Sequence, residues 1–222
     1  MIKTALWTAV VCLVLLILAA AAGYLYLEHS GALSRVDTLD RVAIVFSSHG
    51  EDGAQIAQVI ALVTKDGHAV DFVNPDTGVK VPNTSFAHLR DAYPFGGAAL
   101  VAHLLEPRAG GRVAWVDVPE REWMKLLQAG PSVEVTLSAG MHVFDGNRLA
   151  TFPSGHSTVS AADVPLLLVG AARLPAAQRD SIRSSVATAS LEALSGLRPA
   201  ETASDLSLQA LARLLKTVPE KK

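Results

Sequence analysis

The chain has 222 residues, half of them hydrophobic, and 19 basic against 21 acidic residues give a formal net charge of −2. A nucleic-acid binder needs a basic stripe along its surface, and the scattered Arg and Lys residues supply none, so nucleic acid is excluded as a partner. Cys12 is the only cysteine. The chain therefore forms no internal disulfide and no thiolate metal site, and its stability depends on an ordinary hydrophobic core.

The first segment is an uncharged apolar run from Ala5 to Leu27. It matches the roughly 20 residues needed to cross about 30 Å of hydrocarbon. Lys3 is the only charge before it, so the positive-inside bias keeps the N-terminus in the cytoplasm and exports the rest. We predict a single-pass protein of the cell membrane, with a cytoplasmic tip and transmembrane helix over 1–28, a linker over 29–40 and an extracytoplasmic domain over 41–222. A cleaved signal peptide is the alternative.

Strand patterns open the exported part. The run Val42–Phe46 is compact, apolar and rich in β-branched residues, and it ends in the loop-forming segment Ser47–Gly53. Two further apolar runs, Ile56–Thr64 and His68–Asn74, are separated by Lys65-Asp66-Gly67. Because Asp-Gly is a strong hairpin signal, we predict that these two runs form an antiparallel pair.

Helical and strand patterns then alternate to the C-terminus. Helices are predicted over Ser85–Asp91, over Gly97–Glu106, after Pro119-Glu120, over about Ala176–Leu194 and over about Leu206–Val218. Strands are predicted at Arg112–Val118 and Val133–Leu137. This alternation predicts an α/β fold, an α/β/α sandwich with a mixed central sheet. The segments expected in that sheet are those near Val42, Ile60, Val70, Ala114 and Val135.

Three short motifs occur in the same order as in a known family. The segment His88–Gly97 resembles "Lys-Leu-Asn-Ala-Ala-Tyr-Ala-Tyr-Gly-Gly", Asp76–Val79 is similar to the end of "Ile-Pro-Arg-Asp-Thr-x-Val", and Ala139–Gly146 is similar to "Pro-Gly-x-x-x-Leu-Asn-Gly". These motifs belong to the LytR-CpsA-Psr family, exported membrane-anchored enzymes that move lipid-linked glycopolymers onto peptidoglycan. The resemblance covers about Arg41 to Val218. It implies that family's fold, a polyprenyl-linked substrate and Mg²⁺ wherever the activity is retained.

The departures from the family pattern fall on residues that carry chemistry. The resemblance implies that arginines hold the lipid pyrophosphate, since a guanidinium fork binds phosphate oxygens bidentately. The positions matching the family's arginines, metal-binding Asp and lysine hold Pro75, Ser154, His156, Gln58 and His88. Only Asp76 is retained, which makes it the candidate catalytic residue. The candidate binding residues are His88, Arg90, Arg148, Ser154 and His156. Arg90 and Arg148 can replace the missing phosphate-binding arginines only if the fold turns them into the same pocket.

The predicted function is therefore a membrane-anchored envelope protein, a non-catalytic or weakly active pseudoenzyme that binds a polyprenyl-phosphate lipid or an envelope protein partner. The alternative is an active phosphotransferase that attaches lipid-linked glycopolymer to peptidoglycan. A lipid would need an apolar tunnel, and the sequence does not distinguish a lined tunnel from a filled core. The side chains concerned are Val45, Ile60, Leu62, Val70, Phe72, Leu100, Leu104 and 166–168.

Two other patterns are weaker. The segment Phe152–Ser157 resembles the middle motif of type 2 phosphatidic acid phosphatases, but the chain has neither of that family's flanking motifs. The loop Ser47–Asp52 combines hydroxyl, imidazole and carboxylate groups, a composition that we interpret as a solvated loop because a triad is recognised by geometry. No histidine pair has helical zinc-motif spacing, so no metal site is predicted.

Overall fold

The computed structural model describes residues 41–218, except for 65, 66, 68, 145 and 147. The predicted membrane segment over 1–28, the linker over 29–40 and part of the Lys65-Asp66-Gly67 turn lie outside this set. Within the described residues, no helix combines the length and the apolar character that a membrane span requires. The anchor and the domain boundaries therefore stay predictions.

A mixed four-stranded sheet forms the centre of the described domain, in the order β3-β2-β1-β4. Strand β1 is antiparallel to β2 and parallel to β4, and β2 is antiparallel to β3, which confirms the predicted hairpin. Seven consecutive residues of β1 are buried, as expected for a strand that is covered on both faces. The strands are β1 (Arg41–His49), β2 (Gln55–Thr64), β3 (Val70–Val73) and β4 (Val113–Val118).

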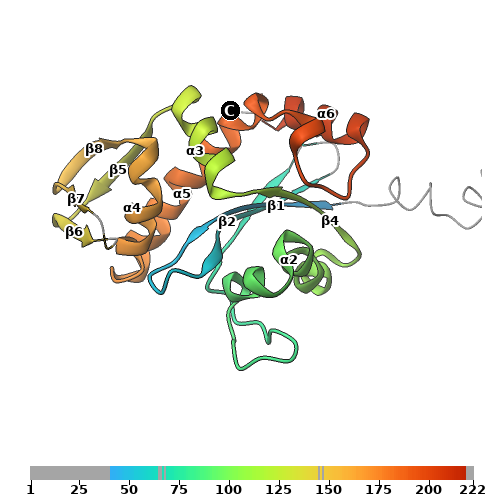
Figure 1. Ribbon diagram of the computed structural model, residues 1–222, viewed down its shortest axis with the longest axis horizontal. Coiled ribbons are helices and arrows are strands. Elements are labelled where there is room, and N and C mark those ends of the chain that lie inside the picture. The colour runs from blue at the N-terminus through green and yellow to red at the C-terminus, as the bar shows by residue number, and fades with distance from the viewer. Residues whose placement is uncertain (1–40, 65–66, 68, 145, 147, 219–222) are drawn as a thin grey trace, which may run out of the picture. The chain divides into compact units, whose positions relative to one another are not determined.

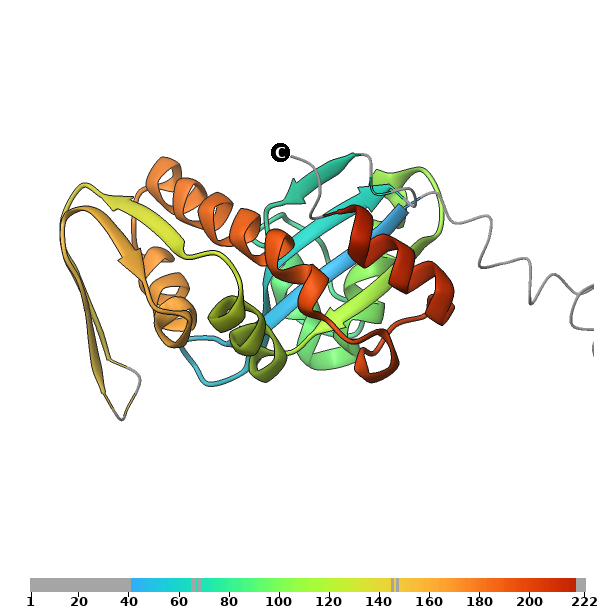
Figure 2. The ribbon, with the colours of Figure 1, turned by 90° about the horizontal axis from the view of Figure 1, so that it is seen from above.

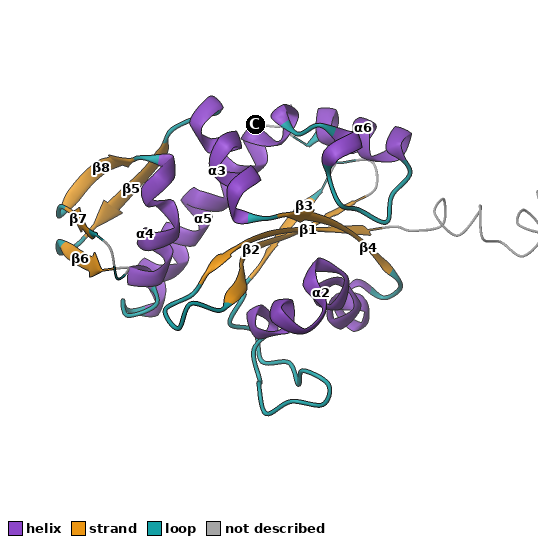
Figure 3. Ribbon diagram, in the orientation of Figure 1, coloured by secondary structure: helices purple, strands orange, loops and turns teal. Residues whose placement is uncertain are grey.

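Helices lie on both faces of this sheet, so the expected mixed α/β fold with a mixed central sheet is confirmed (Figure 1). Helix α2 packs on one face, whereas α3 packs against β1 and α5 against β2 on the other, with α6 on the same side as these two (Figure 3). Viewed from above, α5 and α6 run over the strands (Figure 2). The helices are α2 (Tyr93–Ala109), α3 (Glu120–Ala129), α4 (Val164–Ala171), α5 (Ala176–Glu192) and α6 (Leu208–Thr217).

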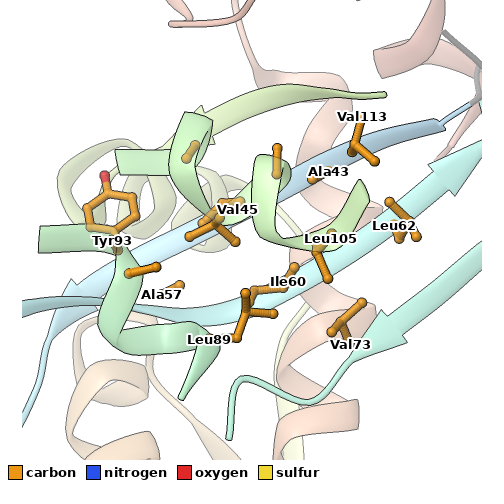
Figure 4. Packing of buried hydrophobic residues seen from close by; sticks show 14 of the residues in the cluster. Ala43, Val45, Ala57, Ile60, Leu62, Val73, Leu89, Tyr93, Leu105 and Val113 are labelled. Carbon is orange, nitrogen blue, oxygen red and sulfur yellow. The ribbon is translucent and has the colours of Figure 1, made fainter. Parts of the chain in front are cut away.

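The face under α2 is a filled core. Val45, Ile60 and Leu62 are at most 1% exposed and pack in one cluster with Val101 and Leu105 of α2 (Figure 4). Burying side chains of this size contributes about 1.5–3 kcal/mol each. Val45 and Leu62 therefore contribute to a packed core, whereas Ile60 belongs to this core and also lines a pocket that contains Arg183.

The opposite face is held by an aromatic contact and a buried hydrogen bond. Phe46 of β1 lies with its ring centroid 5.4 Å from that of Trp123 in α3. The Trp123 indole N–H donates to the Ser190 hydroxyl of α5 at 2.8 Å, so the polar edge of this fully buried ring is satisfied. This bond joins α3 to α5 and fixes α5 over the sheet.

Two small strand pairs lie at one end of the domain (Figure 1). The segment near Val135 was expected in the central sheet, and that prediction is wrong, because β5 pairs with β8 instead. Alternation identified the strand but not its partner, and the partner begins in a Ser- and Gly-containing segment that resembles a loop. The strands are β5 (Val133–Leu137) with β8 (Gly155–Val159), and β6 (Met141–Phe144) with β7 (Leu149–Phe152).

The prediction of a helix over Ser85–Asp91 is also wrong. Gly78 and His88 form an isolated antiparallel bridge, and only Leu89–Ala92 coil into a 3₁₀ turn, η2. Asn83 takes the left-handed conformation with φ of 59°, and the Thr84 hydroxyl donates to the Val81 carbonyl, so local turns replace helical bonds. The result holds η2 against the loop that follows β3.

Candidate anion-binding site

The site is built on the loop after β3. The Asn74 side-chain oxygen accepts the backbone N–H of Asp76 at 2.9 Å, the turn that Asn characteristically forms with the residue two positions on. The backbone N–H of Arg90 in η2 donates to the Pro75 carbonyl at 2.9 Å, and that of Leu89 to Thr77 at 3.0 Å. These bonds hold Asp76 and Arg90 side by side, although 14 positions separate them in the sequence.

Three arginines surround Asp76, and we call these four residues the Asp76 cluster. Arg183 donates from Nη1 to Asp76 Oδ2 at 2.7 Å and to the Asn74 oxygen at 3.1 Å. Arg90 Nη1 lies 3.0 Å from Asp76 Oδ1, and Arg179 Nε lies 3.7 Å from Oδ2. Arg179 and Arg183 are one turn apart on α5 and therefore share a face of that helix. Of these three arginines, only Arg90 is among the binding residues predicted from the sequence.

The charges of the cluster decide how Asp76 is ionised. Burial opposes ionisation, but the hydrogen bond from Arg183 and the charges of Arg183, Arg90 and Arg179 outweigh it and lower the pKa of Asp76 below its ordinary 3.8. Asp91 lies 3.5 Å from Arg90 Nε, and Asp180 lies 4.0 Å from Arg179 Nε on the solvent side. Three guanidinium groups thus face two partly buried carboxylates, Asp76 and Asp91, which leaves one excess positive charge before the exposed Asp180 is counted.

Two donors of the cluster make ion pairs but no hydrogen bond. Nε of Arg90 and Nε of Arg179 are buried and lie 3.5 Å or more from the carboxylates they face, and no described residue accepts a hydrogen bond from them. Buried donors are normally paired, so a site with two such atoms has capacity for an oxygen-rich ligand. Arg183, whose side chain is only 10% exposed, is the fixed member of the set.

Pockets open on the sides of the cluster. One of about 370 Å³ is lined by Arg90 and Arg183 together with Gln58, Asp91 and the loop between β1 and β2. A second, of about 300 Å³, is lined by Asp76, His88, Arg90, Ala172 and Arg179. A third, of about 210 Å³, is largely apolar and is lined by Val59, Phe72, Pro75, Arg183 and Ala187 among others. An anion bound by the arginines therefore has an apolar pocket next to it.

Comparison with known proteins finds similarity in structure. The sequence matches no family profile and no curated protein. A protein from Streptococcus agalactiae superposes with a TM-score of 0.58 at 13% identity, covering 83% of this chain and 76% of the other. TagV of B. subtilis gives 0.52 at 12% identity over 81% and 80%. TagT, a LytR-CPS2A-Psr family protein with bound octaprenyl pyrophosphate lipid, gives 0.51 at 15% identity over 82% and 75%.

This chain has the LytR-CPS2A-Psr fold. The resemblance seen in three short motifs is thereby confirmed at the level of structure. Two of these motifs, Asp76–Val79 and His88–Gly97, meet in space, because Gly78 and His88 form a bridge and Arg90 reaches Asp76.

The Mg²⁺ that the LytR-CPS2A-Psr resemblance implies does not fit the residues present. Mg²⁺ takes carboxylate and other oxygen ligands. Asp76 is surrounded by three guanidinium groups, which compete for both carboxylate oxygens, and Gln58 stands where the resemblance places a metal-binding Asp. Within the described part of the chain, no group of three or more His, Cys, Asp or Glu residues is close enough to hold an ion. Guanidinium groups supply the positive charge here.

The other predicted site residues separate into two groups. His88 lines the pocket that contains Asp76, and its Nδ1 lies 3.4 Å from Asp91 Oδ2. Arg148 pairs with Asp163 at 2.6 Å, His156 Nε2 lies 3.3 Å from Glu134, and Ser154 is exposed between β7 and β8. None of these last three residues pairs with Asp76 within the described part of the chain. Arg90 therefore lies where it can replace a missing arginine beside Asp76, and Arg148 does not.

Arg179 and Arg183 were missed by sequence reasoning. Arginines were sought near Pro153–His156, where the resemblance places them, and the order of the motifs gave no reason to look further along the chain. The signal was nevertheless present, because two arginines four positions apart in the predicted helix Ala176–Leu194 lie on one face. The sequence did not indicate that this face turns toward Asp76.

Proposed function

We propose that this protein is a membrane-anchored, extracytoplasmic envelope protein of the LytR-CPS2A-Psr type that binds a polyprenyl pyrophosphate carrier at the Asp76 cluster. The observation that carries the proposal is the convergence of Arg90, Arg179 and Arg183 on one partly buried carboxylate. A guanidinium fork matches phosphate oxygens geometrically, and each charge-assisted hydrogen bond contributes about 1.5–3 kcal/mol.

The apolar pocket beside the cluster supports a lipid ligand. Arg183 and Pro75 line it together with Val59, Phe72 and Ala187, and Phe72 is 40% exposed. A pyrophosphate on the arginines therefore has a place for the first isoprene units on the α5 side of the sheet. TagT, which shares this fold, binds octaprenyl pyrophosphate. An envelope protein as a further partner stays a prediction.

A second candidate function is transfer of the lipid-linked glycopolymer to an acceptor. Weak or absent activity was expected because the arginines seemed to be missing, and the Asp76 cluster removes that reason. Arginines placed around a pyrophosphate stabilise the charge that develops as a phosphorus–oxygen bond breaks.

The test of binding compares two ligands with the same tail. Full-length protein in detergent is titrated calorimetrically with octaprenyl pyrophosphate and with octaprenol, which lacks the pyrophosphate. We expect the pyrophosphate to bind at least about tenfold more tightly, since two or more charge-assisted hydrogen bonds distinguish it. Equal affinity would show that the arginines do not hold the ligand and would contradict the proposal.

The proposed location has its own test. Reporters that are active only inside or only outside the cytoplasm are fused after Lys222. The uncharged run from Ala5 to Leu27 behind Lys3 predicts activity of the external reporter alone. Activity of the internal reporter would contradict the proposed topology.

A further inference from the structure

A histidine–glutamate pair lies at the end of β1, next to the loop that lines a pocket of Arg90 and Arg183. His49 is the last residue of β1 and Glu120 the first of α3. The His49 Nδ1 atom lies 2.7 Å from Glu120 Oε2, and the backbone N–H of His49 donates to the same oxygen at 3.0 Å. The carboxylate thus fixes the orientation of the ring, and with Nδ1 as the donor the lone pair lies on Nε2.

The second ring nitrogen of His49 faces away from this partner. The side chain is 64% exposed, and Nε2 makes no hydrogen bond with any described residue. The register of β1 against β2 shifts between Phe46 and Ser47, and such shifts re-aim side chains near functional sites. His49 and Glu120 both line a cleft of about 930 Å³.

This cleft shares one wall with the pocket that Arg90 and Arg183 line. Gly50, Glu51 and Asp52 line both the cleft and the pocket of about 370 Å³ that Arg90 and Arg183 line. His49 immediately precedes this shared loop. The imidazole and an anion held by Arg90 and Arg183 would therefore flank the same loop.

We propose that His49 is the general base of a phosphoryl-transfer site, oriented by Glu120, a step that rests on the proposed binding of polyprenyl pyrophosphate. The acceptor is a hydroxyl group or water. As its oxygen forms a bond to phosphorus, its proton passes to Nε2 of His49. The bridging phosphorus–oxygen bond breaks, and the leaving phosphate takes the electron pair. With water as acceptor, polyprenyl pyrophosphate gives polyprenyl phosphate and inorganic phosphate.

Each residue has a separate role in this step. His49 touches the reacting proton and is the catalytic residue, whereas Glu120 is a positioning residue that also stabilises the cationic ring. Arg90 and Arg183 stabilise the charge on the phosphate oxygens. The other charged or titratable groups that line the cleft are Glu51, Asp52, His142, Arg148 and Arg173.

The experiment follows release of inorganic phosphate from octaprenyl pyrophosphate by the full-length protein in detergent. His49→Ala should lower kcat roughly 100-fold or more, the usual contribution of a general base, with KM within about twofold. In the wild type, kcat/KM should increase as the pH rises through the acidic range, and this increase should disappear in His49→Ala. Added imidazole should restore part of the rate of the variant. Glu120→Gln should lower kcat less than His49→Ala does.

Two further variants separate catalysis from structure. His49→Gln keeps a donor for Glu120 but cannot act as a base, so it should be as inactive as His49→Ala. His142→Ala is the matched control, because His142 lines the same cleft but bonds Thr151 instead of a carboxylate, and it should retain wild-type turnover. Wild-type rates in His49→Gln would overturn the inference.

Binding separates failure of this inference from failure of the proposed function. If wild-type protein binds octaprenyl pyrophosphate but releases no phosphate, the inference about His49 is overturned and carrier binding stands. If wild-type protein does not bind the lipid, the proposed function falls, and the inference falls with it.

Discussion

The Asp76 cluster and the two small strand pairs both contain residues that the sequence singled out, but the structure treats them differently. Asp76, Arg90 and the two arginines of α5 come from three separate segments and meet in a partly buried network. His156 belongs to a contiguous motif-like segment, yet it lies on β8 with its side chain 65% exposed. Convergence in space, and not closeness in sequence, makes the former the better site.

Burial sharpens the same difference. The side chain of Arg183 is 10% exposed and bonds both Asp76 and Asn74, whereas Arg148 is 49% exposed and pairs with Asp163. Ion pairs in the interior depend on each partner, while pairs in solvent contribute about 0–1 kcal/mol. The two regions should therefore respond differently to the same kind of substitution.

The largest effect is expected for Arg183→Met. This change leaves a partly buried carboxylate without its hydrogen-bonded partner, and we expect a loss of about 3 kcal/mol of unfolding free energy. The value lies at the low end for a broken buried pair, because Arg90 and Arg179 remain near Asp76. Urea denaturation measures it, with Arg148→Met as the matched control at under about 1 kcal/mol. Equal losses would remove the contrast between the two regions.

The next effect appears on acidification. The folded pKa of Asp76 lies below 3.8, so its contribution to stability is complete above that value and is lost as the pH falls through the folded pKa. Asp76→Asn should therefore be less stable than wild type at neutral pH, and the two should converge in acid. The difference should be constant from pH 7 to about pH 4 and should shrink below that, so thermal denaturation of both proteins is followed from pH 7 down to about pH 2. A difference that does not shrink at the acid end would contradict the role of the carboxylate charge.

A smaller effect is expected for His156→Ala. The imidazole contacts Glu134 from an exposed strand, and both side chains are more than half exposed. Surface substitutions of this kind change stability within about 0.5 kcal/mol. Lipid binding should also be unchanged, as calorimetry can show. Loss of lipid binding in His156→Ala would show that the lipid binds at the strand pairs and not at the Asp76 cluster.

The smallest effect is expected for chelation of divalent cations. Because guanidinium groups supply the positive charge around Asp76, EDTA should leave the dissociation constant for octaprenyl pyrophosphate unchanged within about twofold. The titration is repeated with added Mg²⁺. Binding that requires the ion would show that Asp76 leaves its arginines to ligate a metal.

The strands and most helices could be predicted from the sequence, because burial on both faces gives β1 an unbroken apolar run and Asp-Gly marks the turn after β2. The partner of β5 could not, since alternation states which residues face inward but not which strand lies alongside. In the site, Asp76 and Arg90 were found through motifs. Arg179 and Arg183 were not, because their role depends on how α5 packs, which the Trp123–Ser190 bond helps to set.

The most direct test of the central claim is the dissociation constant of octaprenyl pyrophosphate for single alanine variants of the two regions. Arg90→Ala and Arg179→Ala remove side chains that are 30% and 25% exposed. Each should weaken binding roughly 10- to 100-fold, the effect of one lost charge-assisted hydrogen bond. Arg148→Ala and His156→Ala should bind as wild type does. The opposite pattern, with full affinity after loss of Arg90 or Arg179 and weak binding after loss of Arg148 or His156, would contradict the account.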